Sequence, residues 1–153
     1  MLEGIDVSTY QGAIDWGAVA GSDVAFAWIK ATEGVGWLDP HFRSNWRAAA
    51  DHGLVRGAYH FARPDQTPAR LEAAWFWAAI NMNGGLKPGD LLALDLETGS
   101  GDLSKWATTF LQALQMASGL KAALYTSRGC IDAHGLATAQ LAAFPLWLAD
   151  WGH

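Results

Sequence analysis

An α/β fold with a mainly parallel sheet is predicted by three features of this 153-residue sequence: short apolar runs, helical segments between them, and capping residues at the boundaries. Runs rich in Val, Ile, Leu, Ala and aromatic residues, without alternation, are typical of strands buried on both faces. The six predicted strands are residues 5–8, 24–31, 55–62, 91–96, 122–126 and 146–149. Because strand–helix–strand crossovers are right-handed, these units form either a doubly wound sheet or a barrel of the (β/α) type.

The crossover segments carry helix-boundary signals. Two begin with a capping side chain followed by proline, Asp39-Pro40 and Thr67-Pro68. Glycines follow several of the segments, where a left-handed residue can end a helix. The predicted helical segments are residues 15–19, 39–53, 67–84, 102–119 and 129–144.

Composition narrows the classes of protein. Hydrophobic residues make up 51% of the chain, enough for one domain over residues 1–153 with a substantial core. The chain has fifteen acidic residues and ten Lys and Arg, which gives a net charge of −5, so a basic surface for nucleic acid is not expected. The first residues lack a basic and an apolar signal region, and no apolar run reaches the roughly 18 residues of a membrane span. We therefore expect no membrane insertion and residence in the cytoplasm until release.

Acidic residues at strand ends are the strongest functional signal. Asp95 and Glu97 are two residues apart on one predicted strand, so their side chains share a face with Cα atoms roughly 6–7 Å apart. Burial and mutual repulsion would raise their pKa values until one carboxyl holds a proton near neutral pH, as a general acid requires. Asp6 lies in another apolar strand. The alternative is that the acids cap the following helix or pair with basic residues.

Other side chains at strand ends have a functional and a structural interpretation. Tyr125 and Trp151 could stack on the apolar face of a sugar ring. Lys30 and Glu33 are candidate ligand contacts, or simply an ion pair. His60 is a candidate contact, or a hydrogen-bonded core histidine.

Seven motifs in order resemble the glycoside hydrolase family 25 lysozymes, the N-acetylmuramidases. They are GIDVSTYQG at 4–12, IKATEG at 29–34, DP at 39–40 with NW at 45–46, GAYHF at 57–61, LDLE at 94–97, LYT at 124–126 and LWLA at 146–149. The resemblance implies an irregular (β/α) TIM-like barrel. It also implies hydrolysis of the β-1,4 bond between N-acetylmuramic acid and N-acetylglucosamine in bacterial peptidoglycan, without a metal or other cofactor.

The resemblance also implies roles for single residues. Glu97 corresponds to the general acid, and Asp95 to the carboxylate that stabilises the reaction centre, either by attack at C1 or by orienting the 2-acetamido group of the substrate. Asp6 corresponds to an N-terminal acid that tunes the site. Tyr59, Tyr125 and Trp151 resemble sugar-contacting aromatic residues.

The sequence departs from the family after LWLA, where members usually add further strands and another site aspartate. We therefore expect an incomplete barrel of about six strands, with the last strands missing and the first and sixth strands flanking a gap. Exposed strand edges invite self-association. A phage endolysin, or a fragment of one, fits these features.

Two other functions compete with the muramidase. A truncated barrel could bind peptidoglycan without hydrolysing it. The sequence LDLETG at 94–99 also resembles the opening of metal-dependent exonucleases, whose acids bind two divalent ions. That motif belongs on the first strand of its fold, however, and here it is on the fourth.

Overall fold

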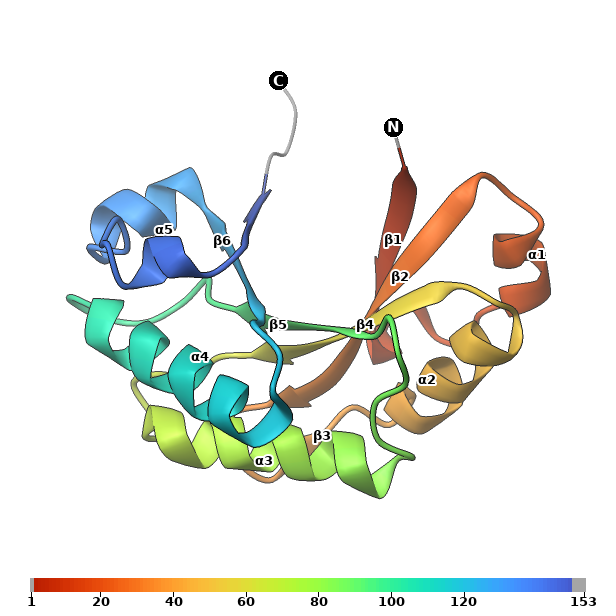
Figure 1. Ribbon diagram of the computed structural model, residues 1–153, viewed down its shortest axis with the longest axis horizontal. Coiled ribbons are helices and arrows are strands. Elements are labelled where there is room, and N and C mark those ends of the chain that lie inside the picture. Colours follow the sequence, from red (N-terminus) through yellow and green to blue (C-terminus); the bar gives the residue numbers. More distant parts are fainter. Residues whose placement is uncertain (1, 150–153) are drawn as a thin grey trace.

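A computed structural model describes residues 2–149, and these form one sheet curled into a trough with helices on its outer side (Figure 1). Between successive parallel strands, a crossover returns the chain to the same end of the sheet. The elements are β1 (Glu3–Val7), η1 (Thr9–Gln11), α1 (Trp16–Ala20), β2 (Val24–Glu33), β3 (Trp37–Leu38), α2 (Phe42–Asp51), β4 (Val55–Phe61), α3 (Ala69–Met82), β5 (Leu91–Asp95), α4 (Ser104–Ser118), β6 (Ala123–Ser127), α5 (Arg128–Ala133), η2 (Leu141–Ala143) and β7 (Leu146–Ala149).

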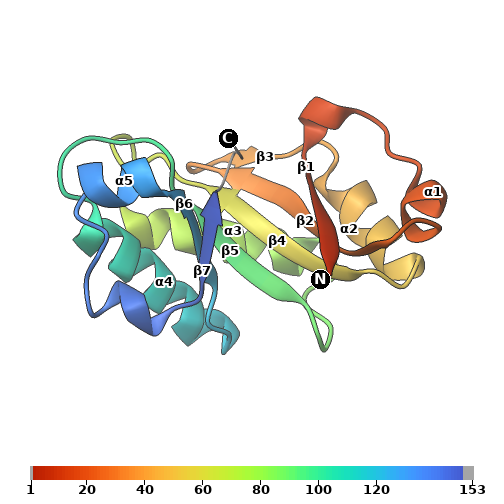
Figure 2. The same cartoon turned by 90° about the horizontal axis from the view of Figure 1, so that it is seen from above.

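The sheet has the order β1-β2-β4-β5-β6-β7, and each of these neighbouring pairs is parallel. All six predicted strands are present, and β1 and β7 are the two outer strands of this order. Seen from above, β1 and β7 stand on opposite sides of the trough (Figure 2). Within residues 2–149, the prediction of an incomplete barrel with a gap between its first and sixth parallel strands is therefore confirmed.

Sequence reasoning missed one strand and misplaced some helix boundaries. β3 pairs antiparallel with β2 through a turn in which Gly34 and Gly36 have φ of 52° and 89°. Asp39 does not cap α2 directly, because its carboxylate accepts the backbone N–H groups of Thr9 and His41. Residues 129–144 do not form one helix, since α5 ends before Gly135, whose φ is 63°. Within residues 2–149, no helix combines the length and apolar character needed to cross a membrane.

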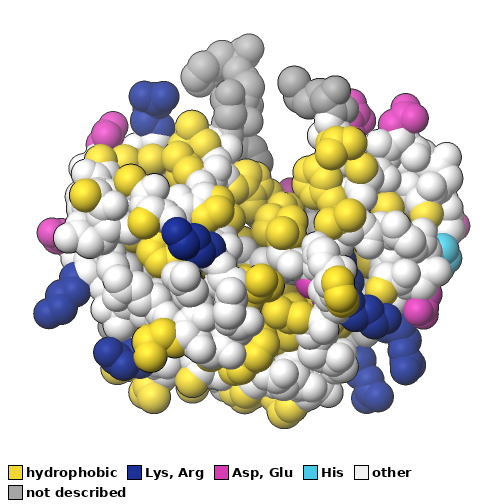
Figure 3. Space-filling view, viewed as in Figure 1, with side chains coloured by type: hydrophobic (Ala, Val, Ile, Leu, Met, Phe, Trp, Pro, Cys, Tyr) yellow, Lys and Arg dark blue, Asp and Glu magenta, His cyan; other side chains and the backbone are white. Residues whose placement is uncertain are grey.

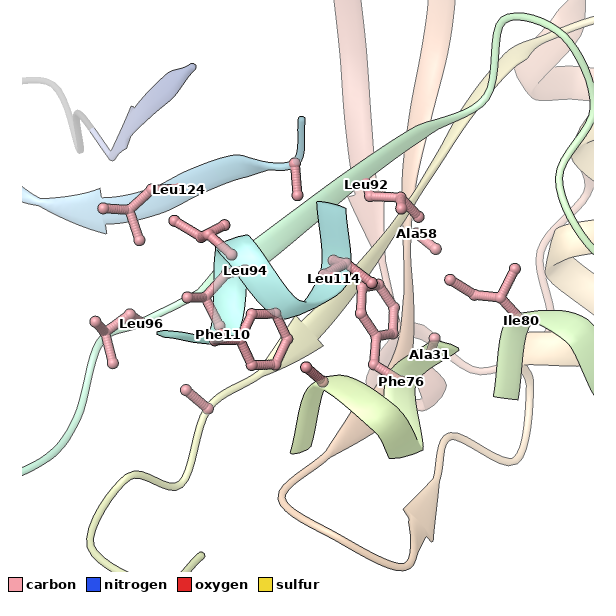
Figure 4. Close-up of a cluster of buried hydrophobic side chains, with 14 of the residues drawn as sticks. Ala31, Ala58, Phe76, Ile80, Leu92, Leu94, Leu96, Phe110, Leu114 and Leu124 are labelled. Carbon is pink, nitrogen blue, oxygen red and sulfur yellow. The ribbon is translucent and has the colours of Figure 1, made fainter. Parts of the chain in front are cut away.

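The hydrophobic core lies between the outer face of the sheet and the helices α2, α3 and α4, and Figure 4 shows part of it. Leu92 and Leu94 of β5 enter this core, together with Phe76 of α3 and Phe110 of α4. Because successive strand side chains point to opposite faces, the residue after Leu94, Asp95, points into the trough. One face of β5 therefore packs in the core, and the other face lines the trough.

The inner face of the trough is closed at its base by stacked tryptophans. Trp28 of β2 lies flat over Gly57 of β4, where a Cβ atom would overlap the indole ring. The ring of Trp28 also stacks on Trp147 of β7, with centroids 4.9 Å apart and planes inclined by 21°. β2 and β7 are not neighbours in the sheet, so this contact requires the sheet to curl.

We expect Gly57→Ala to destabilise the protein by about 1–3 kcal/mol, because the added methyl group displaces an indole that cannot move away from Trp147. Urea unfolding measures the change. Gly129→Ala is the matched control, since its Cβ would meet only the Ser127 hydroxyl at 3.8 Å, within helix α5. Equal stability of the two variants would contradict the proposed packing.

Candidate active site

A cavity of about 240 Å³ opens on the inner face of the trough, at the carboxyl ends of the parallel strands. The predicted acids Asp6, Asp95 and Glu97 all line it, from the two strands β1 and β5 and the loop after β5. Figure 3 shows the molecule hollowed between the two arms of the trough, with hydrophobic side chains on both walls. The lining residues are Asp6, Ser8, Lys30, Tyr59, Phe61, Asp95, Glu97, Tyr125 and Trp147. We call this the acid cavity.

A larger hollow of about 480 Å³ lies on the outer side, among β6, β7, α5 and η2. Its lining is apolar apart from Thr138 and contains no titratable side chain. Size therefore does not identify the functional site, whereas the convergence of charged groups in the acid cavity does.

Asp95 differs from the other buried carboxylates that the structure describes. Asp90 accepts hydrogen bonds from the guanidinium of Arg56 at 2.8 Å, and Asp39 accepts two backbone N–H groups. Glu72 accepts hydrogen bonds from three donors. Within residues 2–149, Asp95 Oδ1 has no hydrogen-bond partner. A buried and unsatisfied carboxyl is costly, and such groups are concentrated at functional sites.

The protonation of the acid pair follows from this burial. Burial, and then the negative charge of Glu97, raises the pKa of Asp95 to about 9, against an opposing effect of Lys30. A carboxyl with this pKa keeps its proton at neutral pH. Because Asp95 and Glu97 interact, this proton belongs to the pair rather than to either carboxyl alone, and Glu97 is half-exposed in the cavity wall.

Aromatic side chains form the other walls of the acid cavity. Burial raises the pKa of both tyrosines. The nearby acids add to this effect, Asp95 most at Tyr59 and Glu97 most at Tyr125, whose pKa rises to about 12. Both side chains therefore remain neutral phenols. Trp147 packs against Tyr125 with ring centroids 4.5 Å apart. Sequence reasoning did not include Trp147 in the site. Its register on β7, directly opposite Tyr125, is the signal that places it there.

Lys30 reaches the cavity from β2 and is held on its other side by an ion pair. Its Nζ lies 2.8 Å from Glu33 Oε2, and Arg63 Nε donates to Glu33 Oε1 at 2.8 Å. The ammonium group also lies 5.0 Å from the ring centroid of Phe61. Glu33 itself does not line the acid cavity, so it contacts the site only through Lys30.

The structure places His60 outside the site, and its inclusion as a ligand contact was wrong. Its imidazole is fully buried on the outer face of the sheet, stacked on Phe110. Nδ1 lies 2.8 Å from Thr32 Oγ1 and Nε2 lies 2.7 Å from Glu72 Oε2. Burial lowers the pKa of His60 despite the opposing effect of Glu72. Trp151, the remaining predicted contact, lies outside the described residues.

Comparisons with known proteins identify the family of the chain. Residues 5–153 match the family described as Glycosyl hydrolases family 25. The chain is 32% identical to Lysozyme M1 of Streptomyces globisporus over 99% of its own length and 55% of that protein's. A second relative is the protein YegX of Escherichia coli, of which the chain covers 56%. The chain thus spans about half the length of the curated relatives that it matches.

Solved structures share the fold of this chain. A bacterial lysozyme from Streptomyces coelicolor superposes with a TM-score of 0.87 at 32% identity, covering 99% of this chain and 75% of that one. A muramidase from Trichobolus zukalii superposes with a TM-score of 0.88 at 30% identity, covering 99% and 78%.

The raised pKa of Asp95 predicts how stability depends on pH. An unfolded Asp has a pKa of about 3.9, so between about pH 4 and pH 9 the folded protein binds more protons than the unfolded chain. The free energy of unfolding should therefore fall as pH rises through this window, by at most about 1.4 kcal/mol per pH unit. Urea unfolding across the window should show a shallower fall for Asp95→Asn. The exposed Asp23→Asn is the control and should keep the parent's slope; an unaltered slope in Asp95→Asn would refute the assignment.

Proposed function

This chain belongs to glycosyl hydrolase family 25, and from that premise we propose that it is a lysozyme that hydrolyses the β-1,4 bond between N-acetylmuramic acid and N-acetylglucosamine in bacterial peptidoglycan. The observation that carries the proposal is the acid cavity, in which Asp6, Asp95 and Glu97 meet between aromatic walls. Peptidoglycan is the substrate class that follows, and the polysaccharide strand is the part that enters the trough.

Glu97 is the proposed general acid. It lies in the loop just after β5, half-exposed in the cavity wall, where a glycosidic oxygen can reach it. Asp95, two residues earlier, lines the same cavity but is less exposed, so Glu97 is the more accessible of the two to the leaving oxygen. In this scheme the pair holds one proton, which lies on Glu97 when the leaving oxygen departs.

Asp95 and Asp6 are the proposed electrostatic groups. Once the proton leaves the pair, Asp95 carries negative charge beneath the sugar ring, where positive charge develops at C1 in the transition state. It acts there either as a nucleophile or by orienting the 2-acetamido group of the substrate. Asp6 approaches from β1, on the opposite arm of the trough, and adds negative charge to the same space.

The remaining lining residues bind the sugar. Tyr59 and Tyr125 remain phenols and can both donate and accept hydrogen bonds with hydroxyl or acetamido groups. Trp147 and Tyr125 offer aromatic faces to the apolar side of a pyranose. Lys30 is the cation that lines the acid cavity, and it balances part of the acidic charge.

Two broader expectations remain predictions from the sequence. Self-association would use the outer edges of β1 and β7, which have no neighbouring strand within the described residues. The second expectation is residence in the cytoplasm until release, as in an endolysin. Among solved structures, the CTP1L endolysin is 28% identical to this chain with a TM-score of 0.81.

Replacement of the general acid tests the proposal. Glu97→Gln keeps the size of the side chain but cannot donate a proton, so we expect it to lower the rate of wall hydrolysis by about 10²–10⁴-fold. The measurement is clearance of purified cell walls together with the appearance of new reducing ends. Glu3→Gln, an exposed glutamate on the same sheet, is the control and should retain the parent rate.

The outcomes separate the competing functions. Reducing ends released by the parent and not by Glu97→Gln support a glycosidase. Binding of both proteins to walls without release of reducing ends would favour a non-catalytic peptidoglycan-binding module instead. Metal-dependent cleavage of single-stranded DNA by the parent would favour the exonuclease alternative.

A further inference from the structure

A second groove lies beside the acid cavity, and its lining contains none of the three acids Asp6, Asp95 and Glu97. Its volume is about 390 Å³, and it is formed by the β2–β3 turn and the loop between β4 and α3. The residues that line it are Glu33, Gly34, Val35, Trp37, Arg63, Gln66 and Thr67. We call this the hairpin groove.

The hairpin groove and the acid cavity share one wall. That wall is the ion pair between Lys30, which lines the cavity, and Glu33, which lines the groove. Phe61 lies at the same boundary, with the Lys30 ammonium and the Arg63 guanidinium 5.0 Å and 4.9 Å from its ring centroid. A polymer leaving the acid cavity in this direction would therefore cross directly into the groove.

The acid cavity alone is small for a polymeric ligand. Its volume of about 240 Å³ is below the roughly 300–1,000 Å³ of a typical ligand pocket, while the hairpin groove falls within that range. A polysaccharide strand held at the acid cavity must extend over neighbouring surface. The hairpin groove is the adjoining surface that is already concave.

The chemistry of the groove suits a neutral sugar. Trp37 is 38% exposed, and its backbone is fixed where its carbonyl accepts a hydrogen bond from Trp75 Nε1 at 3.0 Å. Arg63 and Gln66 can hydrogen-bond hydroxyl and acetamido groups beside the indole. Glu33 and Arg63, the two charged side chains in the lining, form an ion pair, so the lining itself carries no net formal charge.

We propose that the hairpin groove is an additional saccharide-binding subsite, in which Trp37 stacks on a sugar ring of the strand whose reacting bond lies in the acid cavity. The inference rests on the proposed function for the identity of the polymer. The β2–β3 turn would then contribute to the binding of longer glycan strands.

Binding of strands of two lengths tests the subsite without catalysis. The probes are peptide-free glycan strands from amidase-treated peptidoglycan, separated into tetrasaccharides and octasaccharides, and the protein carries Glu97→Gln to prevent turnover. We expect the octasaccharide to bind about tenfold more tightly than the tetrasaccharide. Adding Trp37→Ala should bring the ratio of the two Kd values close to one, since aromatic stacking and area burial of this size correspond to about a tenfold change.

Matched variants separate the subsite from a general effect. Trp37→Tyr keeps an aromatic face and should retain most of the length preference. Gln66→Ala, on the opposite wall and without contact to Lys30, should lower it about threefold. Met116→Ala, at an exposed position of α4, should leave it at the parent value. Thermal unfolding of each variant reports whether it folds.

Several results would overturn the subsite. A length preference that survives Trp37→Ala, or that is absent from the Glu97→Gln protein, excludes a sugar in the groove. A Trp37-dependent preference seen only with peptide-bearing strands would assign the groove to the stem peptide instead. Wall hydrolysis by the parent is measured separately: a parent that does not hydrolyse walls but shows the Trp37-dependent preference refutes the proposed function and keeps the subsite.

Discussion

The stack of Trp28 on Trp147 is the contact on which the shape of the site depends. These residues come from β2 and β7, which are separated in the sheet by three other strands, yet their rings lie 4.9 Å apart. Gly57 makes the contact possible because it leaves room for the indole against the sheet. A flatter sheet would separate the rings and also move Asp6, on the strand next to β2, away from Asp95. The curvature that buries two tryptophans is thus the curvature that gathers the acids.

Two buried acids on opposite faces of this sheet show how burial can serve either stability or chemistry. Glu72 is fully buried but accepts hydrogen bonds from His60, from the Arg63 backbone and from the Thr67 hydroxyl, so its negative charge is compensated. Asp95 is nearly as buried, but one carboxylate oxygen has no partner within residues 2–149, and the neighbouring charge with the largest effect on its pKa is another carboxylate, Glu97. Compensation makes the first group structural. The uncompensated group retains a proton at neutral pH and costs stability as pH rises.

The order of elements and the acid pair could be predicted because they are local properties of the sequence. Apolar runs that form strands, glycines that end helices and the spacing of Asp95 and Glu97 can be identified without knowing the fold. The face on which His60 lies could not be predicted, because a strand apolar on both sides carries no alternation. Because Tyr59 lines the cavity, the alternation of strand side chains turns the next residue, His60, to the opposite face, where its Nδ1 meets Thr32 Oγ1. Trp147 was missed for a related reason: its place opposite Tyr125 is fixed by strand register, a long-range property.

The open side of the barrel does not prevent assembly of the acid cavity within residues 2–149. Every strand of the main sheet order contributes: Asp6 from β1, Lys30 from β2, Tyr59 from β4, Asp95 from β5, Tyr125 from β6 and Trp147 from β7. The core that stabilises these strands lies on the other face, against α2, α3 and α4, so of the residues that line the cavity, Trp147 is the one that also carries the stack on Trp28. Substitutions on the inner face should therefore alter binding and protonation more than folding, except where, as at Gly57, the inner face also carries the curvature.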